Sequence, residues 1–190
     1  KAREAEPWVD LASFSNRDYY PGRGLWMRTL WYFVSLLVFE SGWMPWGRPK
    51  IWLLRLFGAR IGPGLVIKPH VRIKYPWRLA VGVHSWIGQN VWIDNIENVS
   101  IGDHVCLSQL TYLCTGGHDH RRRTFDLVAR PIQIKNGAWL GASCLVLGGI
   151  TVHANAIVAA GSVVTKEVAQ GTIVAGNPAV LLPRKREMVS

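Results

Sequence analysis

The chain has 190 residues, of which 49% are hydrophobic and 18% are charged. This length and composition suit one well-buried domain with a small appendage and exclude an intrinsically disordered chain. The formal net charge is +10, yet the sequence has no zinc-finger spacing, helix-turn-helix pattern or aromatic platform for single strands, so nucleic acid is not an expected partner.

Residues 1–58 are predicted to form a helical segment that is basic and rich in Trp. Residues 25–39 are apolar on nearly every helical face, and Ser41-Gly42 supplies a stop signal. A second short helix is expected from Pro49 to Gly58, where Pro suits the first turn and Gly the C-terminal cap. The longest apolar run, Leu30 to Phe39, is about half of the roughly 20 residues that a membrane-spanning helix needs.

The positive charge of the chain is concentrated in this front part. Residues 1–80 contain 13 Lys and Arg against 5 Asp and Glu, together with seven of the ten Trp. Two interpretations stay open: the segment caps the end of the following domain, or it also contacts an anionic membrane surface.

An aliphatic residue recurs every six positions over most of residues 61–164. The cleanest run has its aliphatic positions at Ile134, Leu140, Val146, Val152, Val158 and Val164. Period-2 strands of a sandwich would also place aliphatic residues six apart, but they would not hold one phase through six repeats. The pattern therefore predicts a mainly β protein, with a left-handed parallel β-helix of about five coils over residues 59–168.

Two interruptions of the repeat indicate where a binding face lies, because insertions in a solenoid form loops on one side. The first is a two-residue slip between Ile93 and Ile101. The second is an extruded loop, expected over residues 115–131, in which the six-residue pattern disappears. Residues 169–190 are expected to leave the coils as a C-terminal extension. The three Cys residues, at positions 106, 114 and 144, form no Cys-x-x-Cys pair and fit a reducing cytoplasm.

Several motifs resemble the hexapeptide-repeat O-acetyltransferases, which include galactoside, maltose and serine acetyltransferases. They are Thr115-Gly-Gly-His118, Trp139-Leu-Gly-Ala, Val158-Ala-Ala-Gly-Ser-Val-Val-Thr-Lys166 and Ala175-Gly-Asn-Pro-Ala. Within that family, residues 92–103 and 113–119 look most like the branch that acts in colanic acid and exopolysaccharide biosynthesis.

The resemblance implies transfer of acetyl from acetyl-CoA to a sugar hydroxyl, which needs a base to accept the hydroxyl proton. It places the catalytic base at His118, in the Gly-flanked loop. Asn90, Asp94 and Asn95, at and near the first interruption, are the expected acceptor-binding residues. For Asp94, an alternative interpretation as a turn-forming residue is equally open.

The resemblance also implies the acetyl-CoA site. The pantetheine arm would pass Trp139, Gly141, Ala142, Ala160 and Gly161, whose small size leaves the backbone accessible. Thr165, Lys166 and Arg184 would meet the phosphates. In the same family, each site lies between two subunits of a homotrimer, so we expect a homotrimer, with a sugar or lipid-linked sugar as the acceptor.

Two alternatives belong to other classes of protein. A zinc enzyme like the γ-class carbonic anhydrases would need three converging His, whereas His70, His84, His104 and His153 occupy turn positions of separate repeats, so no metal is expected. A non-catalytic β-helix scaffold would not need the histidine loop. The expected location is the cytoplasm, with the inner face of the membrane as the finer alternative.

Overall fold

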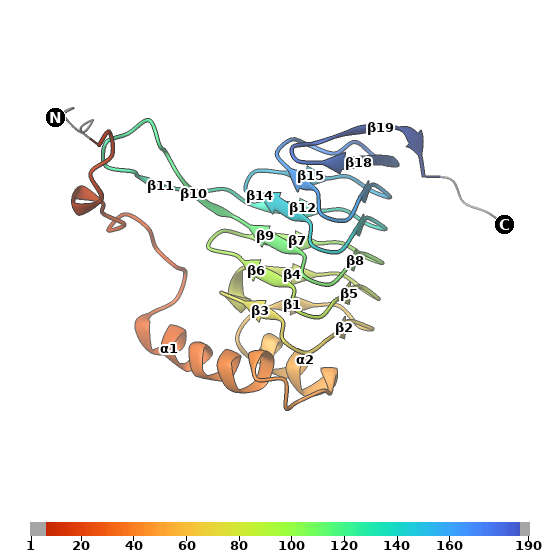
Figure 1. Ribbon diagram of the computed structural model, residues 1–190. Helices are drawn as coiled ribbons and strands as arrows, with labels where there is room; N and C mark the ends of the chain where they lie inside the picture. The colour runs from red at the N-terminus through yellow and green to blue at the C-terminus, as the bar shows by residue number, and fades with distance from the viewer. Residues whose placement is uncertain (1–6, 187–190) are drawn as a thin grey trace.

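The computed structural model describes residues 7–186, and it shows a triangular prism built from short parallel strands with helices across one end (Figure 1). Each coil contributes one strand to each of three sheets, which we call A, B and C. The predicted β-helix is confirmed, and sheets A and C contain five strands each, which matches the expected number of coils.

The strands follow one another regularly around the prism. Sheet A contains β1 (Arg60–Ile61), β4 (Leu79–Val81), β7 (Val99–Ile101), β12 (Ile132–Ile134) and β15 (Thr151–Val152). Sheet B contains β2 (Val66–Ile67), β5 (Trp86–Ile87), β8 (Cys106–Leu107), β13 (Trp139–Leu140), β16 (Ile157–Val158), β18 (Thr172–Gly176) and β19 (Ala179–Lys185). Sheet C contains β3 (Arg72–Ile73), β6 (Trp92–Asp94), β9 (Tyr112–Cys114), β14 (Leu145–Leu147) and β17 (Val163–Val164).

The core is a set of three aliphatic columns, one behind each sheet. In sheet C, for example, Ile73 pairs with Ile93, which pairs with Leu113, and all three are at most 2% exposed. The register thus stacks each repeat's aliphatic residue on that of the next coil. Burial of a Leu or Ile side chain contributes about 1.5–3 kcal/mol, so the repeated position is what holds the coils together.

At the corners between strands, one residue per turn adopts a left-handed backbone conformation. His is one of the residue types that are enriched in this conformation, which accounts for the histidines found there. His70, His84 and His104 have φ between 52° and 58°, and the rings of His84 and His104 stack 5.5 Å apart along one edge. Within residues 7–186 the structure contains no group of three or more His, Cys, Asp or Glu side chains arranged to hold a metal ion.

The N-terminal end of the prism is closed by a helical cap. It consists of α1 (Leu25–Val34), a π-helical turn η2 (Ser35–Glu40) and α2 (Gly47–Leu56), close to the predicted helices. Phe39 and Leu54 are fully buried against the first coil, and the Trp31 Nε1–H donates to the Ile73 carbonyl at 2.8 Å. In the part of the chain that the structure describes, no helix is long and apolar enough to cross a membrane.

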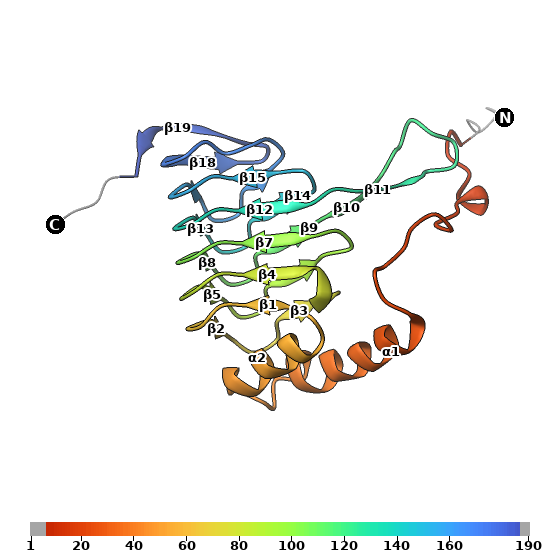
Figure 2. The same cartoon turned by 180° about the vertical axis from the view of Figure 1, so that it is seen from behind.

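The predicted loop is an antiparallel hairpin that projects far from the prism (Figures 1 and 2). Its strands are β10 (Gly116–His118) and β11 (Leu127–Ala129), and the Arg130 N–H donates to the Thr115 carbonyl at 2.9 Å to close its base. The segment that precedes α1 runs alongside, with a short 3₁₀ turn η1 (Leu11–Ser13) near the hairpin tip. A second 3₁₀ turn, η3 (Pro76–Arg78), lies at the corner after β3.

The C-terminal part differs from the expected extension in one respect. Strand β18 pairs in parallel with β16 and so adds one more strand to sheet B before β19 returns antiparallel along it. The aliphatic column continues into this strand through Val174, which is 7% exposed.

Lys50 in α2 is an unusual member of the cap, because its side chain is fully buried and its Nζ has no hydrogen-bond partner among the described residues. Burial lowers the pKa of this lysine. The unfolded chain therefore binds the proton more tightly than the folded one, so Lys50 costs stability below its folded pKa, and stability rises with pH up to the unfolded pKa.

We expect Lys50→Met to stabilise the protein by about 1–3 kcal/mol, because it replaces a buried unpaired ammonium with an apolar chain of similar length. Thermal and urea unfolding at pH 7 would measure the change. Arg48→Met, at an exposed position of the same helix, is the matched control and should change stability by less than about 0.5 kcal/mol. A lower stability of Lys50→Met would show that the ammonium has a favourable partner.

Candidate active site

His118 lies on β10 of the hairpin, exposed to solvent, with its ring fixed by two neighbours. Its Nδ1 is 2.8 Å from the carbonyl oxygen of Phe125, and its ring stacks on the Phe125 ring with centroids 4.4 Å apart and planes 2° from parallel. The ring of Phe14 meets the imidazole edge-on at 5.4 Å.

This geometry suits a proton acceptor. A carbonyl oxygen only accepts hydrogen bonds, so Nδ1 carries the proton and donates it to Phe125. In the neutral imidazole, Nε2 then holds the free lone pair and points away from that carbonyl. The hairpin therefore presents, at the surface of the chain, an imidazole whose orientation is fixed and whose Nε2 can accept a proton.

The polypeptide before α1 packs over the hairpin, which the sequence pattern did not indicate. The Asp10 N–H donates to the Arg123 carbonyl at 2.8 Å, and the Tyr19 hydroxyl donates to the Ile96 carbonyl at 2.7 Å. Burial raises the pKa of Tyr19 to about 12, so its hydroxyl stays a donor over the physiological range. Phe14 and Tyr19 thus become part of the surroundings of His118.

A cavity of about 480 Å³ lies between this segment, the hairpin and the corner after β3. His118 and Leu127 line it from the hairpin, Tyr19 from the N-terminal segment, Lys74 from the corner and Arg28 from α1. Its size fits a sugar ring with room to spare, and His118 lies in its wall.

The acidic residues at the hairpin tip are engaged with arginines. Asp119 accepts hydrogen bonds from Arg121 at 2.9 and 3.1 Å, and these bonds lower the pKa of Asp119 to about 2. Asp126 pairs with Arg122 at 2.5 Å. Neither carboxylate contacts the imidazole of His118, whose orienting partner is the Phe125 carbonyl.

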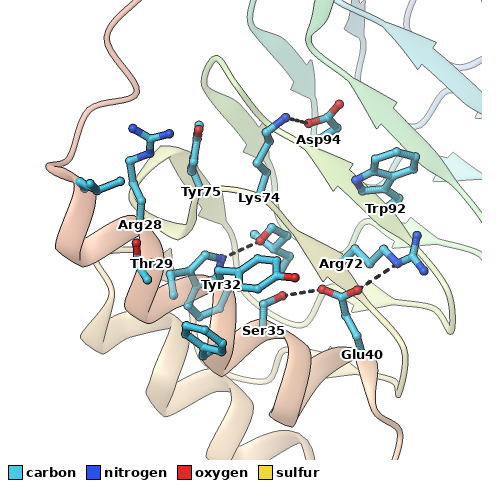
Figure 3. A pocket seen from close by; sticks show the side chains of 14 residues that line it. Arg28, Thr29, Tyr32, Ser35, Glu40, Arg72, Lys74, Tyr75, Trp92 and Asp94 are labelled. Atoms are coloured by element: carbon cyan, nitrogen blue, oxygen red, sulfur yellow. Dashed lines mark hydrogen bonds and ion pairs between the residues drawn. The ribbon is translucent and has the colours of Figure 1, made fainter.

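The three expected acceptor-binding residues lie at different places, and none lines the cavity that contains His118. Asp94, at the end of β6, forms an ion pair with Lys74 at 3.0 Å and lines the adjoining cavity between α1 and sheet C (Figure 3). The Tyr112 hydroxyl donates to its second oxygen at 3.4 Å. Asn90, with φ of 59°, occupies the corner between sheets B and C, which is a different edge of the prism.

Asn95 is fully buried, and its side chain joins two coils. Its Oδ1 accepts from the Tyr75 N–H at 2.9 Å, while its Nδ2 donates to the Tyr75 carbonyl at 2.6 Å. Both polar ends are therefore satisfied by the backbone of the previous coil, so the structure gives Asn95 a structural part in holding the corner that carries Lys74.

Replacing Asn95 by Ala should destabilise the protein by about 1–3 kcal/mol, because it leaves the buried Tyr75 N–H without a partner, whereas the Tyr75 carbonyl still accepts from the Arg78 N–H at 3.0 Å. Urea unfolding followed by tryptophan fluorescence measures this loss. Asn90→Gly, which keeps the left-handed turn at an exposed corner, should change the unfolding free energy by less than about 0.5 kcal/mol. Equal effects of the two substitutions would contradict the structural part assigned to Asn95.

The residues expected to bind acetyl-CoA fall into two groups. Trp139 lies on sheet B, and Gly141, Ala142, Ala160 and Gly161 follow it at the edge between sheets B and C. There the Gly161 N–H donates to the Ala142 carbonyl at 2.8 Å, and a Cβ on Gly141 would come within 2.6 Å of the Ala160 nitrogen. Small residues are thus required for the coils to stack, and together they form a flat edge beside the half-exposed indole of Trp139.

The second group lies elsewhere. Thr165 and Lys166 occupy the edge between sheets C and A, the same edge from which the hairpin leaves, and they line a cavity of about 380 Å³ with β19. Arg184 is exposed on β19. One chain therefore carries His118 on the hairpin at the C–A edge and the Trp139 group on the B–C edge.

Comparison with known proteins agrees with this fold. Residues 131–166 match the bacterial transferase hexapeptide model of six repeats. The chain is 38% identical to WcaF of Escherichia coli strain K12, a protein whose name assigns it to colanic acid biosynthesis as an acetyltransferase. That similarity covers 94% of this chain and 98% of WcaF.

Two solved structures are similar throughout the β-helix. A hexapeptide-repeat-containing acetyltransferase of Vibrio cholerae, complexed with acetyl coenzyme A, has a TM-score of 0.76 at 26% identity over 85% of this chain and 88% of the other. A galactoside acetyltransferase in complex with coenzyme A has a TM-score of 0.73 at 25% identity over 84% and 80%. The chain thus belongs to the hexapeptide-repeat acetyltransferases, and within them it is similar to the colanic acid branch.

Proposed function

We propose that this acetyltransferase transfers the acetyl group of acetyl-CoA to a hydroxyl of a sugar used in exopolysaccharide or surface glycan biosynthesis, with His118 as general base. The observation that carries the proposal is the imidazole on the projecting hairpin, with Nδ1 held by the Phe125 carbonyl and Nε2 free. Complexes of similar acetyltransferases with acetyl coenzyme A and coenzyme A support the choice of donor.

The chemistry needs one proton to move twice. Nε2 of His118 takes the proton of the sugar hydroxyl as its oxygen attacks the thioester carbonyl, which forms a tetrahedral oxyanion. When this intermediate collapses, the C–S bond breaks, and the imidazolium returns the proton to the departing thiolate of CoA. The Phe125 carbonyl, which accepts from Nδ1 throughout, stabilises the imidazolium that forms between the two steps.

We propose further that the active enzyme is a homotrimer with each site between two subunits. The support is that the two halves of the proposed site lie on different edges of one prism. The hairpin with His118 leaves the C–A edge, whereas the Trp139 group lines the B–C edge. A neighbouring subunit that packs its B–C edge against the projecting hairpin would complete the site. In such a site acetyl-CoA would lie along Trp139, Gly141, Ala142, Ala160 and Gly161, with Thr165, Lys166 and Arg184 as candidates for its phosphates. Asp94, which pairs with Lys74 in the wall of the cavity that His118 also lines, remains a candidate acceptor-binding residue.

His118→Ala should lower the rate of acceptor-dependent CoA release at least a hundredfold, equivalent to about 2.7 kcal/mol of lost transition-state stabilisation. The assay would use acetyl-CoA with a panel of sugar acceptors, and calorimetry would show whether the variant still binds acetyl-CoA with the wild-type Kd. His120→Ala, two residues further along the same hairpin, is the matched control and should keep its activity. Unchanged activity of His118→Ala with intact donor binding would require another base.

The cap is the second functional surface that we propose, as a contact with the inner face of an anionic membrane. Its inner side chains are buried, but Trp26, Trp43, Trp46 and Trp52 are 88%, 61%, 65% and 62% exposed. Between Asp18 and Asp94, Glu40 is the single acidic residue, against ten Lys and Arg. Exposed Trp beside unopposed basic charge is the combination that binds the interface of anionic bilayers.

Flotation with vesicles should show binding to phosphatidylglycerol-rich membranes that is weaker at 0.5 M salt and weak on phosphatidylcholine alone. The double substitution Trp26→Ser and Trp52→Ser should reduce binding at least tenfold. Trp86→Ser is the matched control, because Trp86 is 58% exposed but lies on sheet B of the prism. If the cap variant instead lost a higher oligomer while vesicle binding stayed the same, the surface would be a contact between copies of the chain.

A further inference from the structure

His118 lines two cavities, and the one beside the N-terminal segment is positive, although a neutral sugar needs no cation. Its wall includes Arg28 and Lys74, and no acidic residue lines it within the described residues. Two carboxylates adjoin its lining residues, and both are already paired: Asp94 with Lys74 at 3.0 Å, and Glu97, which follows Ile96, with Arg78 at 3.6 Å.

Arg28 is the cation of this cavity whose charge no carboxylate among the described residues neutralises. It lies in the second turn of α1, its Nε is enclosed, and that atom has no hydrogen-bond partner in the part of the chain that the structure describes. No ion pair of Arg28 occurs within residues 7–186 either. A half-buried guanidinium with an unused donor costs solvation free energy, which an anionic ligand in the cavity would offset.

Arg28, Tyr75 and Lys74 stand next to one another and point the same way, away from the cap helix (Figure 3). The same three residues line both the cavity of His118 and the adjoining one, which also has about 480 Å³. They therefore form the boundary between the two cavities, with the base on one side.

The adjoining cavity is apolar toward the cap. Leu25, Tyr32 and Phe33 of α1 line it and are at the same time exposed on the outer surface, 70%, 61% and 52% respectively. It thus connects the boundary cations with the exposed apolar face of the cap. Outward from His118 there is first a space of the size of a sugar, then the cations Arg28 and Lys74, and then the apolar groove.

We infer that Arg28 and Lys74 bind a diphosphate attached to the acceptor sugar, so that the sugar ring reaches His118 while the group beyond the diphosphate lies in the apolar groove. This inference rests on the proposed function and adds the chemical class of the acceptor. A diphosphate links sugars either to nucleosides or to prenyl lipids, and the apolar lining beside the cap fits a prenyl chain.

The test measures binding of three probes to the full-length protein by calorimetry: farnesyl diphosphate, uridine diphosphate and glucuronate, which carries an anionic group but no phosphate. At least one diphosphate should bind ten times more tightly than glucuronate. Tighter binding of farnesyl diphosphate assigns the lipid-linked source, and tighter binding of uridine diphosphate assigns the nucleotide-linked source.

Variants locate the site. Arg28→Gln and Lys74→Gln should each weaken diphosphate binding at least tenfold, whereas Arg48→Gln, an exposed arginine outside both cavities, should leave it unchanged. Asp94→Asn removes the carboxylate that neutralises Lys74 and should tighten diphosphate binding severalfold. Near-ultraviolet circular dichroism and the Kd for acetyl-CoA, measured on every variant, report whether the fold and the donor site are intact.

Equal effects of Arg28→Gln and Arg48→Gln, or equal affinity for glucuronate and both diphosphates, would overturn the inference. Either result is separate from a failure of the proposed function, which would appear as absent acetyl-CoA binding or as full activity of His118→Ala.

Discussion

The structure depends on the stacking of one aliphatic side chain per strand upon its counterpart in the next coil. Ile73, Ile93 and Leu113 illustrate the constraint, since each is buried only because its neighbours above and below are present. A prism held together in this way cannot change its walls without losing core contacts. It can change at its corners and ends, and these are the places where the functional groups of this chain occur.

Most of the departures from the regular prism lie at the C–A edge and at the N-terminal end. These two places meet around His118. The hairpin leaves from the edge, the cap closes the end, and the polypeptide before α1 joins the two through Phe14 and Tyr19. Cap and base are thus parts of one assembly. The exposed apolar face of the cap and the imidazole of His118 lie at opposite sides of the same pair of cavities.

The periodic features were predictable from sequence, because they depend on neighbours at fixed spacing. The coils, the hairpin and both cap helices followed from hexads, from the loss of hexads over residues 115–131 and from cap signals such as Gly58. The surroundings of His118 did not follow, because Phe14 and Arg28 reach it through contacts that no local pattern encodes. Asn95 shows the converse: a polar residue at an interrupted repeat suggested ligand binding, whereas its amide is used by the backbone of Tyr75. The excess of Arg and Lys over residues 1–80 indicated a basic surface, but not that Arg28 and Lys74 would line one cavity with His118.

The hairpin also affects how the chain can fold. Ala80 pairs with Ser100, twenty residues further on, and Gln133 pairs with Thr151, eighteen further on, but Ser100 pairs with Gln133, thirty-three further on. Lengthening the closed loop from 20 to 33 residues adds only about 0.4 kcal/mol of closure entropy. Because that increment is so small, the solenoid carries the hairpin with little loss of stability. The same prism can therefore accommodate hairpins of different length, and with them differently shaped surroundings for His118, at nearly constant stability.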